Sequence, residues 1–413
     1  MKIAFFIKST TFHKGFGGFE TQNKNLCEGL AKRGHKVVVY SPKKELGFDE
    51  KEEAGVLYKF VACRFAKFRA LYSNRSDSWE NRVIELFSKD HSAEKYDLVV
   101  GQSSWALPVI RKKAEFGVKV VSILHGSKIG EYQTELKNAK SLKEIAVCLR
   151  DIPHVLRAFF GTQREFVHGS EKLVAVSSFV KKSIIDETYV AESKVEVIHN
   201  GVDENKFISK ADTVEETYHG DKTVNGIVKL IYVGRVIRAK GLFVLADSLK
   251  YIYNQGEKSW CLEIVGDGEA LADLKKVITG SGLSDKITFT GFINYSEIIK
   301  KLSSSDVFIL PSQRLEGFPM TIVEAMFTAL PVIASDIGGN SDAVEDGVTG
   351  FLTEPGNVQN LAEKIQFLIK NREKRQEMGR NSRNKAVKEF TISHMLDEYE
   401  RIFTEVVNMG VSK

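Results

Sequence analysis

The sequence predicts an α/β protein built from two Rossmann-like, doubly wound domains that face a central cleft. Short runs of β-branched residues alternate with longer amphipathic stretches almost from end to end of the 413-residue chain. This alternation is typical of βαβ units and a mostly parallel sheet. The length is two to three times the ~150 residues of a common single domain. A polar, aperiodic stretch at about 204–226 interrupts the alternation and predicts an interdomain linker.

The first domain is expected over residues 1–205, with a C-terminal helix at about 391–413 packing back on it. A helical pattern over 19–32 ends at Gly34, and glycine commonly closes a helix. The apolar runs of this domain are typical of strands buried on both faces. We expect these strands at 3–7, 36–40, 97–100, 119–124, 172–176 and 194–198.

The second domain is expected over residues 206–390 and shows the same alternation. Ligands of open α/β sheets bind beyond the carboxyl ends of the strands, so the loops that follow strands are the places to look for function. We expect strands at 230–234, 261–265, 286–290, 307–310 and 331–335. The intervening helices are expected at 241–253, 270–279, 296–302 and 321–329.

The composition is that of a globular protein without a strong electrostatic target. The 59 basic and 54 acidic residues are interspersed and give a formal charge of +5, well short of a nucleic-acid-binding signature. No apolar run reaches the ~18 residues that span a membrane. The four cysteines are far apart and indicate free thiols in a reducing compartment. A cytoplasmic protein is expected, with peripheral contact at the inner membrane face left open.

Two glutamates follow the strand expected at 307–310. Glu316 and Gly317 lie in a loop, and Glu324 falls on the second turn of the next helix. Eight residues span ~12 Å if they are helical, enough to reach both ends of a nucleotide sugar. The N–H groups at the helix start could face a diphosphate. Taken alone, such glutamates are more often solvated surface acids.

A basic pair follows the first strand of the second domain. Arg235 and Lys240 stand at the opening of a helix, where two cations could neutralise a leaving diphosphate without a metal. Such a pair is, by itself, more often solvated. The sequence contains no Asp-x-Asp pair that would suggest a metal-dependent transferase.

Gly17 and Gly18 lie in the first strand-to-helix loop, where the missing Cβ lets the backbone approach a ligand. A plain tight turn is the alternative. Glu20 occupies the place of the last glycine of a dinucleotide fingerprint, and the second strand ends without an acidic ribose ligand. A dehydrogenase is therefore disfavoured.

Three further loop positions are candidates. His125 follows the apolar run 120–124, although a lone histidine there is more often structural. Gly266 belongs to a glycine-rich turn that could be only a connection, and Phe292 follows the strand expected at 286–290.

These segments together resemble the retaining nucleotide-sugar glycosyltransferases of family 4 (glycosyl transferases group 1), which have the GT-B fold. In that family two glutamates separated by seven residues follow a Pro-Ser strand end. The matches run in the family's order from about residue 3 to 355. They comprise Gly17-Gly18-Phe19-Glu20, His125-Gly126, Val176-Ser177-Ser178, Asn200-Gly201-Val202-Asp203, Val233-Gly234-Arg235 with Lys240-Gly241, Val265-Gly266-Asp267-Gly268, Pro311-Ser312 with Glu316 and Glu324, Gly338-Gly339 and Asp346-Gly347-Val348-Thr349-Gly350.

The resemblance implies a metal-independent, retaining hexosyl- or N-acetylhexosaminyl-transferase. Its substrate is a nucleoside diphosphate sugar, with no cofactor, and its product belongs to polysaccharide, glycolipid or glycoconjugate synthesis. By resemblance, Glu324 binds the ribose hydroxyls, Glu316 the sugar hydroxyls, and Arg235 with Lys240 the diphosphate. His125 would hydrogen-bond the donor sugar near its reacting carbon. The remaining donor-binding positions are Gly17, Gly18, Gly266, Phe292, Gly317 and Phe318.

The chain departs from the family pattern at Ala329, Pro319 and Asp342, none of which removes a chemical group from the site. Other readings stay open: a sugar-nucleotide epimerase or disaccharide phosphorylase of the same fold, or a non-catalytic nucleotide-sugar-binding subunit. The acceptor is expected to be a carbohydrate or a lipid-linked sugar. Basic, aromatic stretches at 64–72 and 157–166 are either ordinary amphipathic helix or a surface for anionic lipid.

Overall fold

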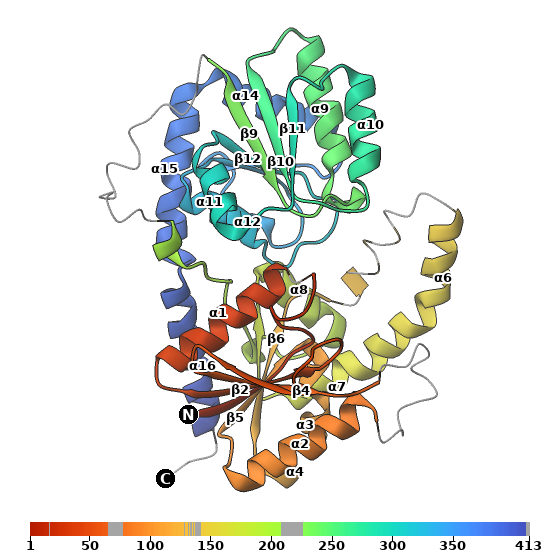
Figure 1. The fold of residues 1–413 in the computed structure, drawn as a ribbon, viewed down its shortest axis with the longest axis vertical. Helices are drawn as coiled ribbons and strands as arrows, with labels where there is room; N and C mark the ends of the chain where they lie inside the picture. The colour runs from red at the N-terminus through yellow and green to blue at the C-terminus, as the bar shows by residue number, and fades with distance from the viewer. Residues whose placement is uncertain are drawn as a thin grey trace. The chain divides into compact units, whose positions relative to one another are not determined.

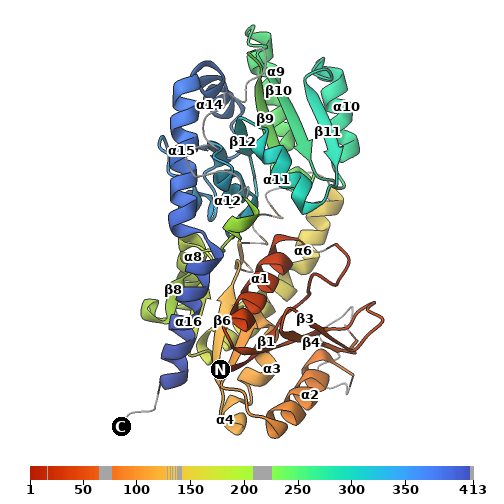
Figure 2. The ribbon, with the colours of Figure 1, turned by 60° about the vertical axis from the view of Figure 1, so that its left-hand side comes forward.

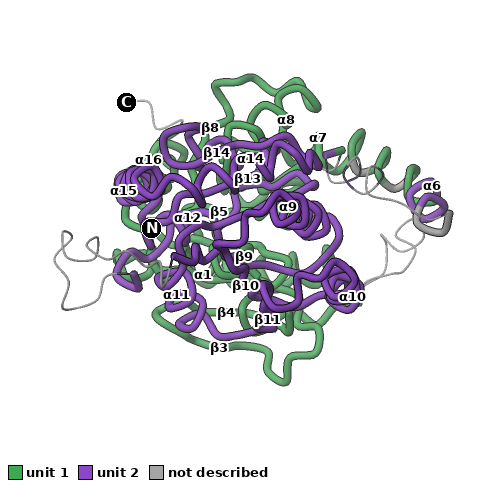
Figure 3. Tube along the Cα trace, turned by 90° about the horizontal axis from the view of Figure 1, so that it is seen from above, with its two compact units in different colours: residues 1–129, 150–200, 392–413 green, residues 130–149, 201–391 purple. Residues whose placement is uncertain are grey.

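The computed structural model describes residues 1–15, 17–64, 77–127, 129–130, 132, 134, 136, 142–207 and 226–409. The chain forms two compact units, coloured separately in Figure 3. Unit 1 comprises residues 1–129, 150–200 and 392–413, and unit 2 comprises residues 130–149 and 201–391. Most of the expected linker and nearly all of the basic stretch 64–72 lie outside the described residues. Each unit is built around its own sheet (Figure 1).

Unit 1 contains an eight-stranded sheet in the order β3-β4-β2-β1-β5-β6-β7-β8. All neighbouring strands are parallel except β3 and β4. The strands are β1 (Lys2–Phe6), β2 (Lys36–Pro42), β3 (Glu50–Glu53), β4 (Val56–Val61), β5 (Leu98–Gln102), β6 (Lys119–Leu124), β7 (Lys172–Ala175) and β8 (Val195–Val197). The strand order reverses between β1 and β5, so the loops after these strands flank the ligand-binding edge of such a sheet.

The helices of unit 1 include the C-terminal α16, which packs on α1. Leu396 of α16 lies so close to Gly29 of α1 that a Cβ on this glycine would be 2.5 Å from the leucine Cδ1. Arg33 Nη1 pairs with Glu400 at 2.6 Å. The helices of the unit are α1 (Gly18–Lys32), α2 (Trp79–Ala93), α3 (Leu107–Ile110), α4 (Lys113–Phe116), α7 (Arg164–Gly169), α8 (Ser178–Thr188) and α16 (Ile392–Asn408), and α6 (Leu142–Arg157) crosses from unit 2 into unit 1.

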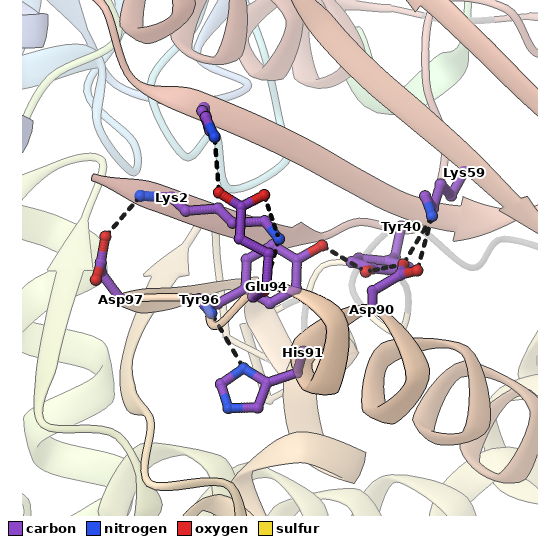
Figure 4. Close-up of polar contacts among 9 residues, drawn as sticks. Lys2, Tyr40, Lys59, Asp90, His91, Glu94, Tyr96 and Asp97 are labelled. Carbon is purple, nitrogen blue, oxygen red and sulfur yellow. Dashed lines mark hydrogen bonds and ion pairs between the residues drawn. The ribbon is translucent and has the colours of Figure 1, made fainter.

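A polar cluster ties the C-terminal part of α2 to the sheet of unit 1 (Figure 4). The Tyr40 hydroxyl donates to Asp90 Oδ2 at 2.6 Å, and Lys59 Nζ donates to Asp90 Oδ1 at 2.9 Å. Lys2 Nζ donates to the Glu94 carbonyl oxygen at 2.6 Å. These contacts contain none of the candidate site residues, and they fix a helix against β1, β2 and β4.

Unit 2 contains a six-stranded, all-parallel sheet in the order β11-β10-β9-β12-β13-β14. Every residue of β12 and β13 is buried. The strands are β9 (Val228–Val233), β10 (Trp260–Val265), β11 (Ile287–Gly291), β12 (Val307–Leu310), β13 (Val332–Ser335) and β14 (Gly350–Thr353). Counted from β9, the order is 3-2-1-4-5-6, that of a dinucleotide-binding Rossmann sheet, with its reversal between β9 and β12.

The helices of unit 2 cover this sheet (Figure 2). α9 packs against α10 and α14, and α12 packs against α11 and α15. They are α9 (Leu242–Asn254), α10 (Leu271–Ser281), α11 (Tyr295–Ser303), α12 (Met320–Phe327), α13 (Asn340–Ala343), α14 (Val358–Lys370) and α15 (Arg372–Glu389). Two Rossmann-like α/β units are therefore present, as predicted. Among the helices within the described ranges, none has the length and apolar character needed to cross a bilayer.

Candidate functional site

The strand reversal in unit 2 lies beside the candidate cations and one candidate acid. Arg235 and Lys240 follow β9, and Glu316 follows β12, the strand paired with β9. In open α/β sheets this is the point where ligands bind. The candidates therefore flank the position that the topology alone favours.

Close backbone contacts hold the two loops together. Gly241 has φ +74°, and a Cβ there would lie 1.7 Å from the Pro311 carbonyl oxygen. Gln313 N donates to the Ala239 carbonyl oxygen at 2.8 Å. Because only glycine permits this approach and this φ, the Lys240-Gly241 dipeptide is set against the loop that carries Glu316.

Lys240 and Glu316 form an ion pair whose members are largely buried. Lys240 Nζ lies 2.8 Å from Glu316 Oε1, with side-chain exposures of 15% and 11%. Ser312 Oγ donates to the same carboxylate oxygen at 2.6 Å. Burial by itself would raise the pKa of Glu316, but the Lys240 charge, hydrogen bonds from Lys240 and Ser312 and the field of Arg314 bring it below its ordinary value. Glu316 is thus a carboxylate at neutral pH.

The paired glycines after β13 support the backbone of Glu316. Gly338 has φ +63°, and a Cβ there would lie 2.2 Å from the Glu316 carbonyl oxygen. Gly339 N donates to that oxygen at 2.8 Å. The Gly338-Gly339 motif therefore has a structural reason: it fixes the loop from which the Glu316 side chain extends.

Glu324 lies on α12 and is 7% exposed. Burial raises the pKa of Glu324 to about 7, although a hydrogen bond with Tyr295 and the charge of Lys206 oppose this shift. Lys206 Nζ lies 5.3 Å from the centre of the Tyr295 ring. Sequence reasoning missed Tyr295 and Lys206. The available signal for Tyr295 was its place in the loop-to-helix segment after β11, three residues beyond the candidate Phe292.

The other cations near Glu316 differ in exposure. Arg235 is exposed, and its carbonyl oxygen accepts a hydrogen bond from the Tyr232 hydroxyl at 2.8 Å. Arg314 was not a sequence candidate. Its Nε is buried and has no hydrogen-bond partner among the described residues. The Lys240 ammonium, by contrast, is already paired.

Three of the remaining candidates in unit 2 differ in what they can offer a ligand. A Cβ on Gly266, whose φ is +134°, would lie 1.9 Å from the Gly234 carbonyl oxygen, so this glycine lets two loops meet. Phe292 is 82% exposed. The Phe318 ring is buried against Phe390, with ring centres 5.3 Å apart, so it packs in the core and only its backbone remains for a ligand.

Gly17 and Gly18 stand at the start of α1, with Gly17 as its N-cap. The Gly17 N–H donates to Glu20 Oε2 at 2.9 Å, and Ser9 Oγ donates to Glu20 Oε1 at 2.5 Å. The glutamate that replaces the last glycine of a dinucleotide fingerprint therefore ties the loop after β1 to the first turn of α1.

His125 is held by a chain of side chains in unit 1. Its Nε2 lies 2.6 Å from Gln102 Oε1, and Gln102 Nε2 donates to Asn23 Oδ1. The Phe19 ring packs edge-on, with ring centres 4.7 Å apart. Burial lowers the pKa of His125 to about 4, so its imidazole is neutral at pH 7.

This chain also defines the tautomer of His125. Because the Gln102 amide nitrogen donates to Asn23, its oxygen must accept, and His125 Nε2 carries the proton. His125 Nδ1 is then left as an acceptor. Sequence reasoning missed both Gln102 and Asn23; the available signal for Asn23 was its place on the helix face of α1 that also carries Leu26 and Leu30.

The candidate residues thus fall into two groups. Unit 2 brings Lys240 and Glu316 into contact, with Arg235 in the same loop as Lys240. Glu324 lies farther along α12. Unit 1 carries Gly17, Gly18 and His125.

Family models match both parts of the chain. The model of glycosyltransferase family 4 matches residues 16–206, and that of glycosyl transferases group 1 matches residues 218–385. The chain is 31% identical over 314 residues to an Escherichia coli protein named UDP-Gal:alpha-D-GlcNAc-diphosphoundecaprenol alpha-1,3-galactosyltransferase, over 70% of this chain and 79% of that protein. It is 30% identical over 256 residues to the capsular polysaccharide biosynthesis glycosyltransferase CapM of Staphylococcus aureus, over 58% of this chain and 63% of that protein.

Solved structures agree on the fold. The crystal structure of Anabaena HepE in complex with UDP aligns with a TM-score of 0.70 at 20% sequence identity, over 98% of this chain and all of that one. The GT-B fold expected from the sequence is thereby confirmed.

Proposed function

Because this chain belongs to the glycosyltransferases of family 4 and group 1, we propose that it is a metal-independent, retaining hexosyl- or N-acetylhexosaminyl-transferase. It takes a nucleoside diphosphate sugar as donor and a hydroxyl of a carbohydrate or lipid-linked sugar as acceptor. Unit 2 binds the donor, and unit 1 serves the acceptor side. The observation that carries the proposal is the Lys240–Glu316 pair at the strand reversal of unit 2, with Arg235 in the same loop.

The chemistry proceeds by departure of the diphosphate. The bond between the anomeric carbon and the phosphate oxygen breaks, and the acceptor oxygen bonds to the same carbon from the same face. The hydroxyl proton goes to the leaving phosphate. Charge builds on the phosphate oxygens, so Arg235 and Lys240 stabilise the transition state more than the ground state.

The carboxylates and His125 orient the donor in this scheme. Glu316 is ionised and held by Lys240, which suits it to accept hydrogen bonds from sugar hydroxyls. Glu324 accepts from the ribose hydroxyls. Neutral His125 presents its Nδ1 lone pair to a hydroxyl of the donor sugar. None of these groups needs a metal ion to act.

For the nucleotide we propose UDP. The Escherichia coli relative is named for a UDP-galactose donor, and the structure of Anabaena HepE was determined with UDP. The exposed Phe292 ring after β11 offers a face on which a base can stack.

We further propose a cytoplasmic enzyme that touches an anionic membrane through one surface of unit 1. This surface comprises the exposed side chains of Leu156, Arg157, Phe160 and Tyr189 and the half-buried side chain of Arg164. The Arg164 guanidinium lies 5.9 Å from the Phe160 ring and 5.7 Å from the Tyr189 ring. Apolar rings interleaved with arginines fit a layer of acidic headgroups above acyl chains.

Vesicle sedimentation tests this surface. At low salt, vesicles rich in phosphatidylglycerol should retain the protein, and vesicles of phosphatidylcholine alone should not. Phe160→Glu should abolish retention, whereas Phe367→Glu, at a ring exposed in unit 2, should not. Retention unaffected by Phe160→Glu would exclude this surface.

A transfer assay tests the function itself. Each UDP-sugar is incubated with lipid-linked and free sugar acceptors in EDTA, and the anomeric configuration of the product is read by NMR. Retained configuration, with loss on the order of 100-fold in Arg235→Ala, supports the proposal. Inverted product would contradict the retaining mechanism. Faster consumption of donor without acceptor would favour an epimerase or phosphorylase, and binding without turnover a non-catalytic subunit.

A further inference from the structure

Glu324, the acid proposed as the ribose ligand, has different neighbours from Glu316. Glu324 is 7% exposed on α12, and within the part of the chain that the structure describes it has no ion partner as close as the one Lys240 gives Glu316. Its neighbours are the Tyr295 hydroxyl, which hydrogen-bonds the carboxyl, and the Lys206 charge. A protonated carboxyl gives up part of its acceptor capacity to its own O–H, so this acid offers a diol its full set of acceptors only when it is ionised.

Tyr295 is firmly anchored. It is the first residue of α11, which packs on α12, and the two helices lie side by side in Figures 1 and 2. Asn294 caps that helix: its Oδ1 accepts from Glu297 N at 2.9 Å, and its own N–H donates to Glu297 Oε2 at 3.1 Å. The capping box fixes where the Tyr295 side chain leaves the helix.

Lys206 comes from a different element, the short helix Glu204–Lys206. Its Nζ lies 5.3 Å from the centre of the Tyr295 ring and 3.8 Å from Asp203 Oδ2. The Lys206 ammonium thus lies beside the ring of the residue that hydrogen-bonds Glu324, and its charge acts on the Glu324 carboxyl.

The other elements packed on α12 carry charges that are placed differently. Arg383 of α15 donates from Nη1 to the Phe327 carbonyl oxygen at 2.6 Å, at the end of α12. Asp342 of α13 is half-buried. Asp203 acts on Tyr295. Tyr295 and Lys206 are thus the groups that favour the ionised form of Glu324.

We propose that Tyr295 and Lys206 are positioning residues for the donor: the Tyr295 hydroxyl holds one side of the Glu324 carboxyl and the Lys206 charge favours its ionised form, so that the other oxygen accepts the ribose hydroxyls. The inference rests on the proposed function, because it takes Glu324 as the ribose ligand. Tight donor binding then requires loss of the Glu324 proton, so the affinity for donor rises as the pH rises through neutrality.

The test is the dissociation constant of a UDP-sugar, measured by calorimetry between pH 6 and 8.5. The donor diphosphate stays ionised throughout this range. His125 stays neutral throughout it, because its pKa is about 4. In the wild type, affinity should rise with pH and level off above neutrality. Tyr295→Phe removes one hydrogen bond to the carboxylate, worth about a tenfold change in its proton affinity. At pH 7 it should bind donor about fivefold more weakly, with near wild-type affinity at pH 8.5.

Lys206→Met should change the dependence of donor affinity on pH in the same direction as Tyr295→Phe, with weaker binding at pH 7 than in the wild type. Matched controls come from Lys258 and Tyr253, which stack at 5.0 Å elsewhere in unit 2. Tyr253→Phe and Lys258→Met should leave the profile unchanged. A structural role for Tyr295 would instead weaken binding equally at every pH, and that result would overturn the inference.

Glu324→Gln separates this inference from the function beneath it. If Glu324→Gln binds donor as well as the wild type, the assignment of the ribose ligand is wrong. If Glu324→Gln binds weakly but the Tyr295→Phe profile coincides with that of the wild type, only the positioning role is wrong.

Discussion

Replacing Lys240 with methionine would leave the Glu316 carboxylate buried without its ion partner. Breaking a buried pair from one side typically costs 3–5 kcal/mol. Since Ser312 Oγ still donates to the carboxylate at 2.6 Å, we expect the lower end, about 3 kcal/mol. Glu316→Gln should also destabilise unit 2. The double variant contains neither charge, so it should be about 2 kcal/mol more stable than the sum of the single effects predicts.

Urea unfolding can measure this cycle in unit 2 alone. Trp260 is fully buried there, while Trp79 and Trp105 belong to unit 1. The Trp260 fluorescence is followed in a common background in which the other two tryptophans are phenylalanine. Strictly additive costs, with a coupling below about 0.5 kcal/mol, would refute a stabilising ion pair.

The pH dependence of the Lys240→Met effect has a defined sign. The folded-state pKa of Glu316 lies below its ordinary value near 4.5. The pair therefore contributes stability that is present above that ordinary value and is lost as the pH falls through the lower, folded-state pKa. The difference between wild type and Lys240→Met should shrink below pH 4.5, and a constant difference would contradict the assignment.

Three further predictions concern single positions. The pKa of Glu324 rises from 4.5 to about 7 on folding, so stability falls as the pH rises between these values. Glu324→Gln should raise the stability of the ligand-free protein at pH 8 by on the order of 3 kcal/mol, and much less at pH 5; equal gains would contradict it. Gly338→Ala should reduce turnover at least ~10-fold by displacing Glu316, whereas Gly347→Ala, which meets no atom within 4 Å at a similar φ, should keep activity; equal turnover would contradict the role of Gly338. Gln102→Leu removes the acceptor of His125 Nε2–H and should lower kcat on the order of tenfold, with Gln102→Glu less impaired; wild-type kcat in Gln102→Leu would contradict this.

The central strands could be predicted because their sequences are continuous apolar runs, as in β1 and β12. The β3–β4 hairpin was missed. β3 reads Glu-Lys-Glu-Glu at an exposed edge, which lacks any strand periodicity, and the Ala54-Gly55 turn, with both φ values positive, is a weak signal by itself. β14 was missed because it has only four residues and begins with glycine.

The site could be predicted only in part. Lys240 and Glu316 are 76 residues apart, and nothing in their spacing requires contact; the strand order brings their loops together. Tyr295 and Gln102 were missed because their roles depend on a partner from another element. Phe318 was expected to contact the donor, but its ring packs in the core against Phe390. An aromatic residue after a glycine occurs both in cores and in ligand-facing loops, so the sequence alone did not distinguish the two.

Thermal unfolding against a panel of UDP, GDP and ADP sugars in EDTA tests the central claim most directly. A donor at 100 times its dissociation constant should stabilise the protein by about 2.7 kcal/mol. We predict that the UDP-sugars stand out, and that Arg235→Ala and Glu324→Gln lose the shift. No shift with any nucleotide sugar, or a shift that appears only with added divalent metal, would contradict a metal-free donor site in unit 2.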